Sequence, residues 1–115
     1  MTDFYDKLEV RDPAEREQDL LAALPKQIGQ AQTAAPAFAK ILDGVKAADI
    51  TSRDALAKLP VTRKSELLGL QKAKRASDPF GGFSAIHFGT RMTRVFASPG
   101  TIYEPEGEAR DYWRT

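Results

Sequence analysis

Prolines and glycines recur at short intervals along this chain, and they limit the length of any regular element. The seven prolines lie at positions 13, 25, 36, 60, 79, 99 and 105. Proline lacks a backbone N–H and its ring crowds the preceding turn, so it begins a helix readily but interrupts one elsewhere. The first two thirds of the chain are therefore predicted to form short helices with proline or glycine at nearly every joint.

The first helix is predicted to begin at Pro13. Asp12 can accept hydrogen bonds from the free amides of a helix start, and Glu15 completes a capping box. Apolar residues then follow at helical spacing, at Leu20, Leu21, Leu24 and Ile28. Because Pro25 lies within this run, we expect a kink or a break there.

Three more helical segments are predicted before residue 76. One begins near Pro36 and ends at Gly44, one follows the capping sequence at 51–54 and stops at Pro60, and one is capped by Thr62. We expect their apolar positions to form a single cluster with those of the first helix. Its members are Leu20, Leu21, Leu24, Ile28, Phe38, Ile41, Leu42, Leu56, Leu59 and Leu67.

The chain changes character after Ala76. Residues 79–82, Pro-Phe-Gly-Gly, suit a tight loop because glycine adopts positive φ or lets another backbone come close. Short β-prone runs at 85–88 and 93–97 predict two strands, and 108–115 predicts the opening of another helix. That helix has no stop signal, so we expect the chain to be a fragment of a longer protein.

The predicted fold class is therefore mainly α. An N-terminal bundle of short helices occupies residues 1–76, and a small β-containing segment occupies residues 77–115.

Composition excludes several kinds of site. The absence of cysteine excludes disulfides and thiolate chemistry, and a single histidine excludes a multi-histidine zinc site. We therefore predict no metal site and no catalytic residue. His87 lies between apolar neighbours, which favours a packed or hydrogen-bonded histidine over a general base. Phe80 and Phe83 beside the glycines are predicted core anchors, with an aryl pocket as the alternative.

Hydropathy and charge exclude or disfavour further classes of protein. No stretch approaches the roughly 20 apolar residues of a membrane span, and no basic-then-apolar signal opens the chain, so a cytoplasmic protein is expected. The net charge is +1, but residues 1–20 sum to −4 and residues 61–95 to +5. Near-neutral overall charge disfavours nucleic-acid binding, so the clusters Arg63–Lys64 and Lys72–Arg75 are predicted to be solvated helix faces.

One short motif could bind phosphate. In the sequence Ser98-Pro99-Gly100-Thr101, small residues and hydroxyls would let backbone amides approach an anion between a strand and a following helix. An ordinary Ser-Pro-Gly turn is the alternative. The motif is no Walker-type loop, and Glu104 and Glu106 would repel a triphosphate unless magnesium lay between them.

Several of these segments, in their order, resemble the N-terminal part of phenylacetate-CoA ligases, which belong to the adenylate-forming acyl-CoA synthetases. The resemblance lies in Tyr5–Leu8, the helices up to Gly44, the run from Ile50 to Leu67, Pro79–Gly82, and Arg94–Thr101. It covers nearly the whole chain.

This resemblance implies a ligase that uses ATP and magnesium to form an acyl-adenylate from an aryl or acyl acid and then transfers the acyl group to coenzyme A. It implies that Ser98, Gly100 and Thr101 bind nucleotide phosphate, while Pro99, Tyr103 and Glu104 depart from the family's pattern. Residues 77–115 would then begin an α/β adenylation domain. We expect the fragment to be inactive alone, with no cofactor bound.

A second hypothesis involves no catalysis. The same helices and the uneven charges would suit a protein-interaction or dimerisation module, and we expect a homo-oligomer. A nucleic-acid binder that uses the basic region at 61–95 is a third and weaker alternative.

Overall fold

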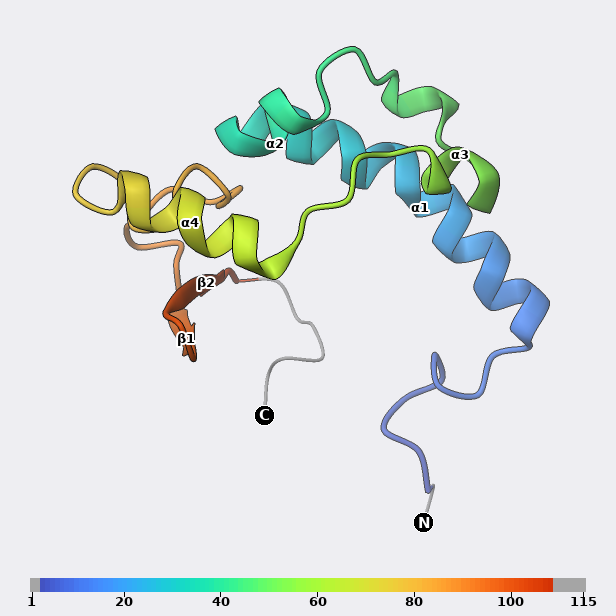
Figure 1. Ribbon diagram of the computed structural model, residues 1–115. Coiled ribbons are helices and arrows are strands. Elements are labelled where there is room, and N and C mark those ends of the chain that lie inside the picture. Colours follow the sequence, from blue (N-terminus) through green and yellow to red (C-terminus); the bar gives the residue numbers. More distant parts are fainter. Residues whose placement is uncertain (1–2, 109–115) are drawn as a thin grey trace. The chain divides into compact units, whose positions relative to one another are not determined.

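The computed structural model describes residues 3–108, which form four α-helices, a short 3₁₀ helix and two strands (Figure 1). The elements are α1 (Pro13–Ala34), α2 (Pro36–Ile41), η1 (Ala47–Asp49), α3 (Arg53–Ala57), α4 (Lys64–Lys74), β1 (Arg94–Ser98) and β2 (Ile102–Glu106). This order confirms a mainly α chain with a small β segment after the helices. The predicted helix at 108–115 lies outside the described residues, apart from the exposed Glu108.

The chain divides into two compact units. The first unit comprises the chain up to Gly29 together with Gly44–Leu59, and the second comprises Gln30–Asp43 together with the chain from Pro60 onward. α4 and both strands therefore belong to the second unit, whereas α3 belongs to the first. The candidate phosphate residues all lie in the second unit.

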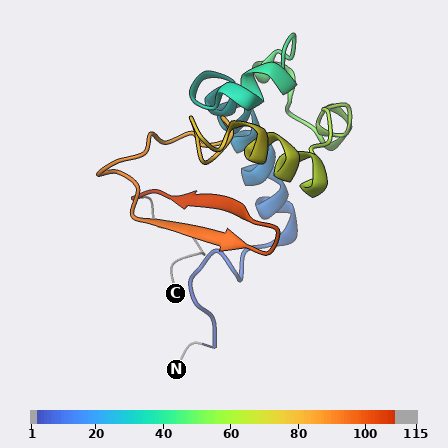
Figure 2. The same ribbon diagram turned by 60° about the vertical axis from the view of Figure 1, so that its left-hand side comes forward.

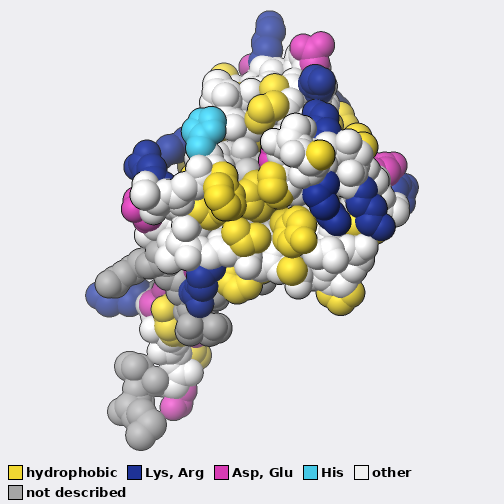
Figure 3. Space-filling view, turned by 90° about the vertical axis from the view of Figure 1, so that its left-hand side faces the viewer, with side chains coloured by type: hydrophobic (Ala, Val, Ile, Leu, Met, Phe, Trp, Pro, Cys, Tyr) yellow, Lys and Arg dark blue, Asp and Glu magenta, His cyan; other side chains and the backbone are white. Residues whose placement is uncertain are grey.

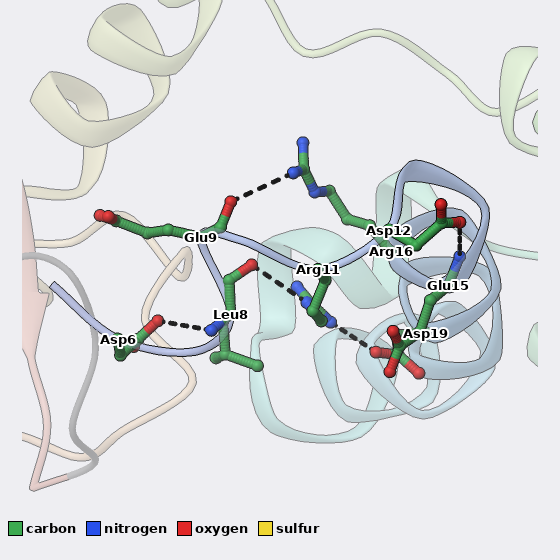
Figure 4. A network of polar contacts seen from close by, with 8 residues as sticks. All are labelled: Asp6, Leu8, Glu9, Arg11, Asp12, Glu15, Arg16 and Asp19. Atoms are coloured by element: carbon green, nitrogen blue, oxygen red, sulfur yellow. Dashed lines mark hydrogen bonds and ion pairs between the residues drawn. The ribbon is translucent and has the colours of Figure 1, made fainter. Parts of the chain in front are cut away.

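α1 begins as the sequence predicts. The Asp12 carboxylate accepts hydrogen bonds from the amides of Ala14 at 2.8 Å and Glu15 at 3.4 Å. The guanidinium of Arg11 extends to Asp19 at 2.5 Å (Figure 4). These contacts satisfy amides that a helix start leaves without partners, and they hold the entering chain against the first turns.

The predicted break at Pro25 is wrong, because α1 continues through this residue to Ala34. Proline costs about 3 kcal/mol inside a helix. Twelve helical residues precede Pro25 and nine follow it, and their hydrogen bonds outweigh the one that proline removes.

An ion pair joins α1 to α3 within the first unit. Arg53 is bound to Glu17 through both ends of its guanidinium, with Nη2 2.6 Å from Oε2. α3 is capped by Ser52, whose hydroxyl accepts from the Ala55 amide at 3.1 Å, as the capping sequence predicts. Glu17 and Arg53 are 36 residues apart, so their contact links two segments that are distant in the sequence.

The predicted tight loop is the centre of the second unit. Gly81 and Gly82 have φ of 62° and 86°, values that favour glycine. The Asp78 carboxylate accepts from the amides of Phe80 at 2.9 Å and Gly82 at 2.7 Å, and the Gly82 carbonyl accepts from the Ala37 amide at 2.9 Å. The loop thus holds the start of α2 against Gly82 and buries the Phe80 side chain.

The two strands form an antiparallel hairpin that lies beside α4 (Figure 2). The register pairs Arg94 with Glu106 and Ser98 with Ile102. Glu106 is buried and accepts from Arg94 at 2.6 and 3.1 Å. This pair closes the open end of the hairpin.

Three predictions of local structure are wrong. Residues 85–88 form no strand, and the second strand is Ile102–Glu106, which the sequence predicts as loop. Cross-strand contacts decide this pairing, since Glu104-Pro105-Glu106 has low intrinsic β-propensity. The cap of α4 is Arg63 rather than Thr62, and the Glu66 carboxylate accepts from the Arg63 amide at 3.3 Å.

The ten predicted members of the apolar cluster are divided between the two units. Of these ten, Leu20 is 55% exposed and Leu56 is 42% exposed, and only Ile28 and Leu42 are buried. The buried apolar residues instead fall into two sets. Ile28 and Ile50 belong to the first unit, and Ala35, Ala37, Leu42, Phe80 and Ile102 belong to the second.

Several large apolar side chains lie on the surface. On the face that Figure 3 shows, hydrophobic side chains gather beside those of lysine and arginine. In the second unit the exposed set is Val61, Leu70, Phe88, Val95 and Phe96. Within residues 3–108, no helix is both long and apolar enough to cross a bilayer.

Candidate phosphate-binding site

The Ser98 motif forms the turn of the hairpin. Pro99, Gly100 and Thr101 connect Ser98 to Ile102, the last pair of the β1–β2 register. A strand therefore follows the motif. The expectation that a helix start adjoins it is wrong, so no helix dipole from the following element points at an anion here.

Gly100 allows the turn to approach α4. Its φ is 132°, and a Cβ at this position would lie 3.4 Å from Cδ2 of Leu68. A larger side chain would therefore be strained by its backbone conformation and would crowd Leu68. This close packing is an independent reason for glycine at position 100, apart from any phosphate.

Gln71 of α4 and Arg75, which caps the C-terminus of this helix, bind the segment that leaves the turn. The Gln71 amide donates from Nε2 to the Tyr103 carbonyl and accepts the Tyr103 amide at Oε1, both at 3.0 Å. Arg75 donates from Nη2 to the Thr101 carbonyl at 2.8 Å, and its guanidinium lies 5.0 Å from the centre of the Tyr103 ring. The prediction that Arg75 is a solvated side chain is wrong, because it is half-buried against the hairpin.

A depression of about 420 Å³ lies between the beginning of α4 and the hairpin. Its polar lining comes from Thr62, Arg63, Lys64, Ser98 and Glu104, and Leu67 and Ile102 form its apolar part. Of the three predicted phosphate-binding residues, only Ser98 lines this depression. The Thr101 carbonyl is bound by Arg75, and Gly100 packs on Leu68.

The charges around the depression favour an anion. Arg63 and Lys64 are exposed and form no ion pair with any residue from 3 to 108, nor does Glu104. Glu106 contributes little repulsion because Arg94 binds both of its oxygens. Among the lining residues, two cations therefore accompany one carboxylate, beside the hydroxyls of Thr62 and Ser98, which can donate to phosphate. Glu66, which accepts from the Arg63 amide, adds a second carboxylate nearby.

Magnesium fits this donor set only together with a ligand. In the described part of the chain, no group of three or more His, Asp or Glu side chains could hold a metal ion. Magnesium is commonly held by one or two carboxylates together with substrate phosphates and water. Glu104 is the one carboxylate among the residues that line the depression.

The other candidate residues have structural roles or lie elsewhere. Phe80 is buried, which confirms it as a core anchor, and the half-buried Phe83 packs edge-on against Phe38, with ring centres 5.2 Å apart. Phe80 also lines a separate depression of about 330 Å³. His87 lies at that depression but is exposed, so the expectation of a packed histidine is wrong.

Sequence reasoning alone assigned Arg63 and Lys64 to a solvated face. They lie about 35 positions before Ser98, and no local pattern connects them. One signal in the sequence points to these residues. Thr62-Arg63-Lys64 combines a hydroxyl with two cations at the start of a helix, and this combination is typical of an anion site.

A scan against protein-family models found no match to this chain, and a search of curated proteins found none either. The resemblance to phenylacetate-CoA ligases stays a prediction that rests on the sequence motifs.

Proposed function

We propose that the second unit binds the phosphates of ATP together with magnesium, as the N-terminal part of a cytoplasmic ligase resembling phenylacetate-CoA ligases. The observation that supports this most is the position of Ser98. It opens onto the same depression as Arg63 and Lys64, two cations without an ion pair among residues 3–108. The Ser98 motif, which the resemblance predicts to bind phosphate, contains no basic residue. Arg63 and Lys64 supply positive charge next to it.

In this proposal the residues act by binding and orientation. Arg63 and Lys64 offset the negative charge of the polyphosphate, and Ser98 and Thr62 donate hydrogen bonds to its oxygens. Magnesium, when bound with ATP, would neutralise charge on the leaving pyrophosphate. The carboxylate of an aryl or acyl acid would attack the α-phosphorus and displace pyrophosphate. The thiol of coenzyme A would then attack the carbonyl of the acyl-adenylate and displace AMP.

We assign no catalytic residue to this chain, and the prediction that it is inactive alone is kept. With ATP, magnesium and a panel of aryl acids, the 115-residue chain is expected to release no pyrophosphate. Sustained release would show that it holds the reacting groups itself.

The binding proposal is tested by calorimetric titration of the chain with ATP and magnesium. The double variant Arg63→Gln/Lys64→Gln should bind at least ten-fold more weakly, because two charges close to a polyanion are removed. The matched control is Lys72→Gln/Lys74→Gln, which removes two exposed charges from the same helix at positions that do not line the depression. Equal affinity in the two double variants would refute this site.

A second candidate function is a protein-interaction module that forms a homo-oligomer. The observation that favours it is a run of exposed apolar side chains before α1, at Phe4, Tyr5, Leu8 and Val10. Light scattering over a range of concentrations tests this alternative. A mass that rises with concentration, together with no binding of ATP, would favour it over the ligase proposal.

A further inference from the structure

One helical face, formed by α4 and its C-terminal cap residue Arg75, contributes both to the depression and to the contacts with the hairpin. Lys64 lines the depression, and Gln71 and Arg75 follow it by seven and eleven positions, which places all three on one side of a helix with 3.6 residues per turn. Lys64 lies near the anion site, while Gln71 and Arg75 hold the hairpin that brings Ser98 to it.

The Gln71 side chain makes hydrogen bonds to β2 of the kind that the backbone of a neighbouring strand would make. It is only 1% exposed, and its amide forms a donor and an acceptor hydrogen bond with the backbone of one residue, Tyr103. An apolar residue of similar length would leave both backbone groups of Tyr103 without these partners. The contact is therefore specific to an amide side chain.

Arg75 acts on the turn itself. Its Nη2 donates to the carbonyl of Thr101, and its guanidinium lies over the ring of Tyr103. Its Nε is buried and has no hydrogen-bond partner within residues 3–108. One donor of this guanidinium is thus left without a hydrogen bond. The position of the guanidinium is therefore determined by its contacts with Thr101 and Tyr103 of the hairpin.

We propose that Gln71 and Arg75 are positioning residues, which set the distance between Ser98 on the hairpin and the cations Arg63 and Lys64 at the start of α4. They touch no ligand in this proposal. The effect of this positioning on binding rests on the proposed function. A fixed distance between Ser98 and the two cations changes the affinity for phosphate only if a phosphate contacts both.

The test uses Gln71→Met and Arg75→Met, with Lys72→Met as the matched control on the same helix. The first readout is amide hydrogen exchange of residues 101–104. The second is the affinity for inorganic pyrophosphate with magnesium, measured by calorimetry. Circular dichroism establishes that each variant keeps its helices. Arg75→Met keeps the test decisive if Gln71→Met does not fold, because Arg75 is only half-buried.

Exchange in residues 101–104 should be at least ten-fold faster in both variants, and pyrophosphate should bind at least five-fold more weakly. Lys72→Met should change neither by more than two-fold. In a charge-preserving variant, Arg75→Lys, affinity should return to within two-fold of the unaltered chain, since lysine can still donate to Thr101.

Unchanged exchange in a folded variant would overturn the proposal. Faster exchange with unchanged pyrophosphate affinity would also overturn it, because the hairpin would then be held without being positioned for the ligand. Failure of the unaltered chain to bind pyrophosphate or ATP would instead refute the proposed function, and the exchange measurement would then decide whether Gln71 and Arg75 fix the turn.

Discussion

Gly81 lies directly against the backbone of Gln71: a Cβ at position 81 would be 2.8 Å from the Gln71 Cα atom. Real Cβ atoms do not approach another carbon this closely, and φ at Gly81 is 62°. The loop and α4 can therefore meet only where position 81 has no side chain.

Gly81→Ala should destabilise the second unit by about 1–3 kcal/mol, because alanine must adopt a left-handed backbone and displace the helix. Urea denaturation followed by circular dichroism measures the change. The control is Gly69→Ala, at an exposed site within α4 where a Cβ meets nothing within 4 Å. That variant should gain about 0.5–1 kcal/mol. Equal effects of the two substitutions would contradict the close approach.

The Glu17–Arg53 pair should make the first unit sensitive to acid. Hydrogen bonding to Arg53, with the charge of its guanidinium, lowers the pKa of Glu17 below its ordinary value. A carboxyl with a lowered pKa in the folded state stabilises that state above its unfolded pKa, about 4.3. This contribution is lost as the pH falls through the lower, folded pKa.

Glu17→Gln should therefore lower Tm at pH 7, and the difference from the unaltered chain should shrink toward zero as the pH falls below about 4. Both side chains are accessible to solvent, so the effect should be small and should weaken at 1 M salt. Adding Arg53→Met to Glu17→Gln should cost little more than either change alone. A difference in Tm that grows on acidification would contradict this account.

The Arg94–Glu106 pair should contribute more, because the Glu106 side chain is only 2% exposed. Arg94→Met removes a guanidinium that binds both carboxylate oxygens, and we expect a loss of about 3 kcal/mol. The matched control is Arg91→Met, whose ion pair with Glu108 spans 3.8 Å between two exposed side chains. Arg91→Met should change the free energy of unfolding by less than about 0.5 kcal/mol. Similar losses in the two variants would show that burial of Glu106 is unimportant.

The charge of Glu104 should limit anion binding in the depression. Glu104→Lys should tighten the binding of ATP and magnesium by about five-fold, or about 1 kcal/mol, since the reversal occurs at a partly screened site. Glu104→Gln should give an intermediate affinity. Calorimetry at two salt concentrations measures both, and unchanged affinity in both variants would mean that the phosphate does not bind near this residue.

Several local signals predicted local structure correctly. Asp12 and Ser52 cap helices as expected, and Gly81 and Gly82 form the tight loop. These features depend on the conformational preferences of one to four consecutive residues. Each could therefore be predicted without knowledge of the rest of the chain.

Features that depend on distant contacts could not be predicted in this way. β2 contains Pro105 between two glutamates, and it is a strand because its partner is β1. Gln71 is buried because Tyr103, 32 residues later, uses its amide. The candidate site shows the same dependence on distant contacts. The motif alone predicts Ser98, whereas only the fold places Arg63 and Lys64 beside it.

The two outer edges of the hairpin differ in their capacity to accept another strand. In an antiparallel pair, alternate residues direct their backbone groups outward. On β2 these residues are Tyr103, whose amide and carbonyl are bound by Gln71, and Pro105, which has no N–H to donate. Their partners on β1 are Ala97 and Val95, both on the exposed strand. A wider sheet can therefore grow from this hairpin in one direction only, across β1 and away from α4.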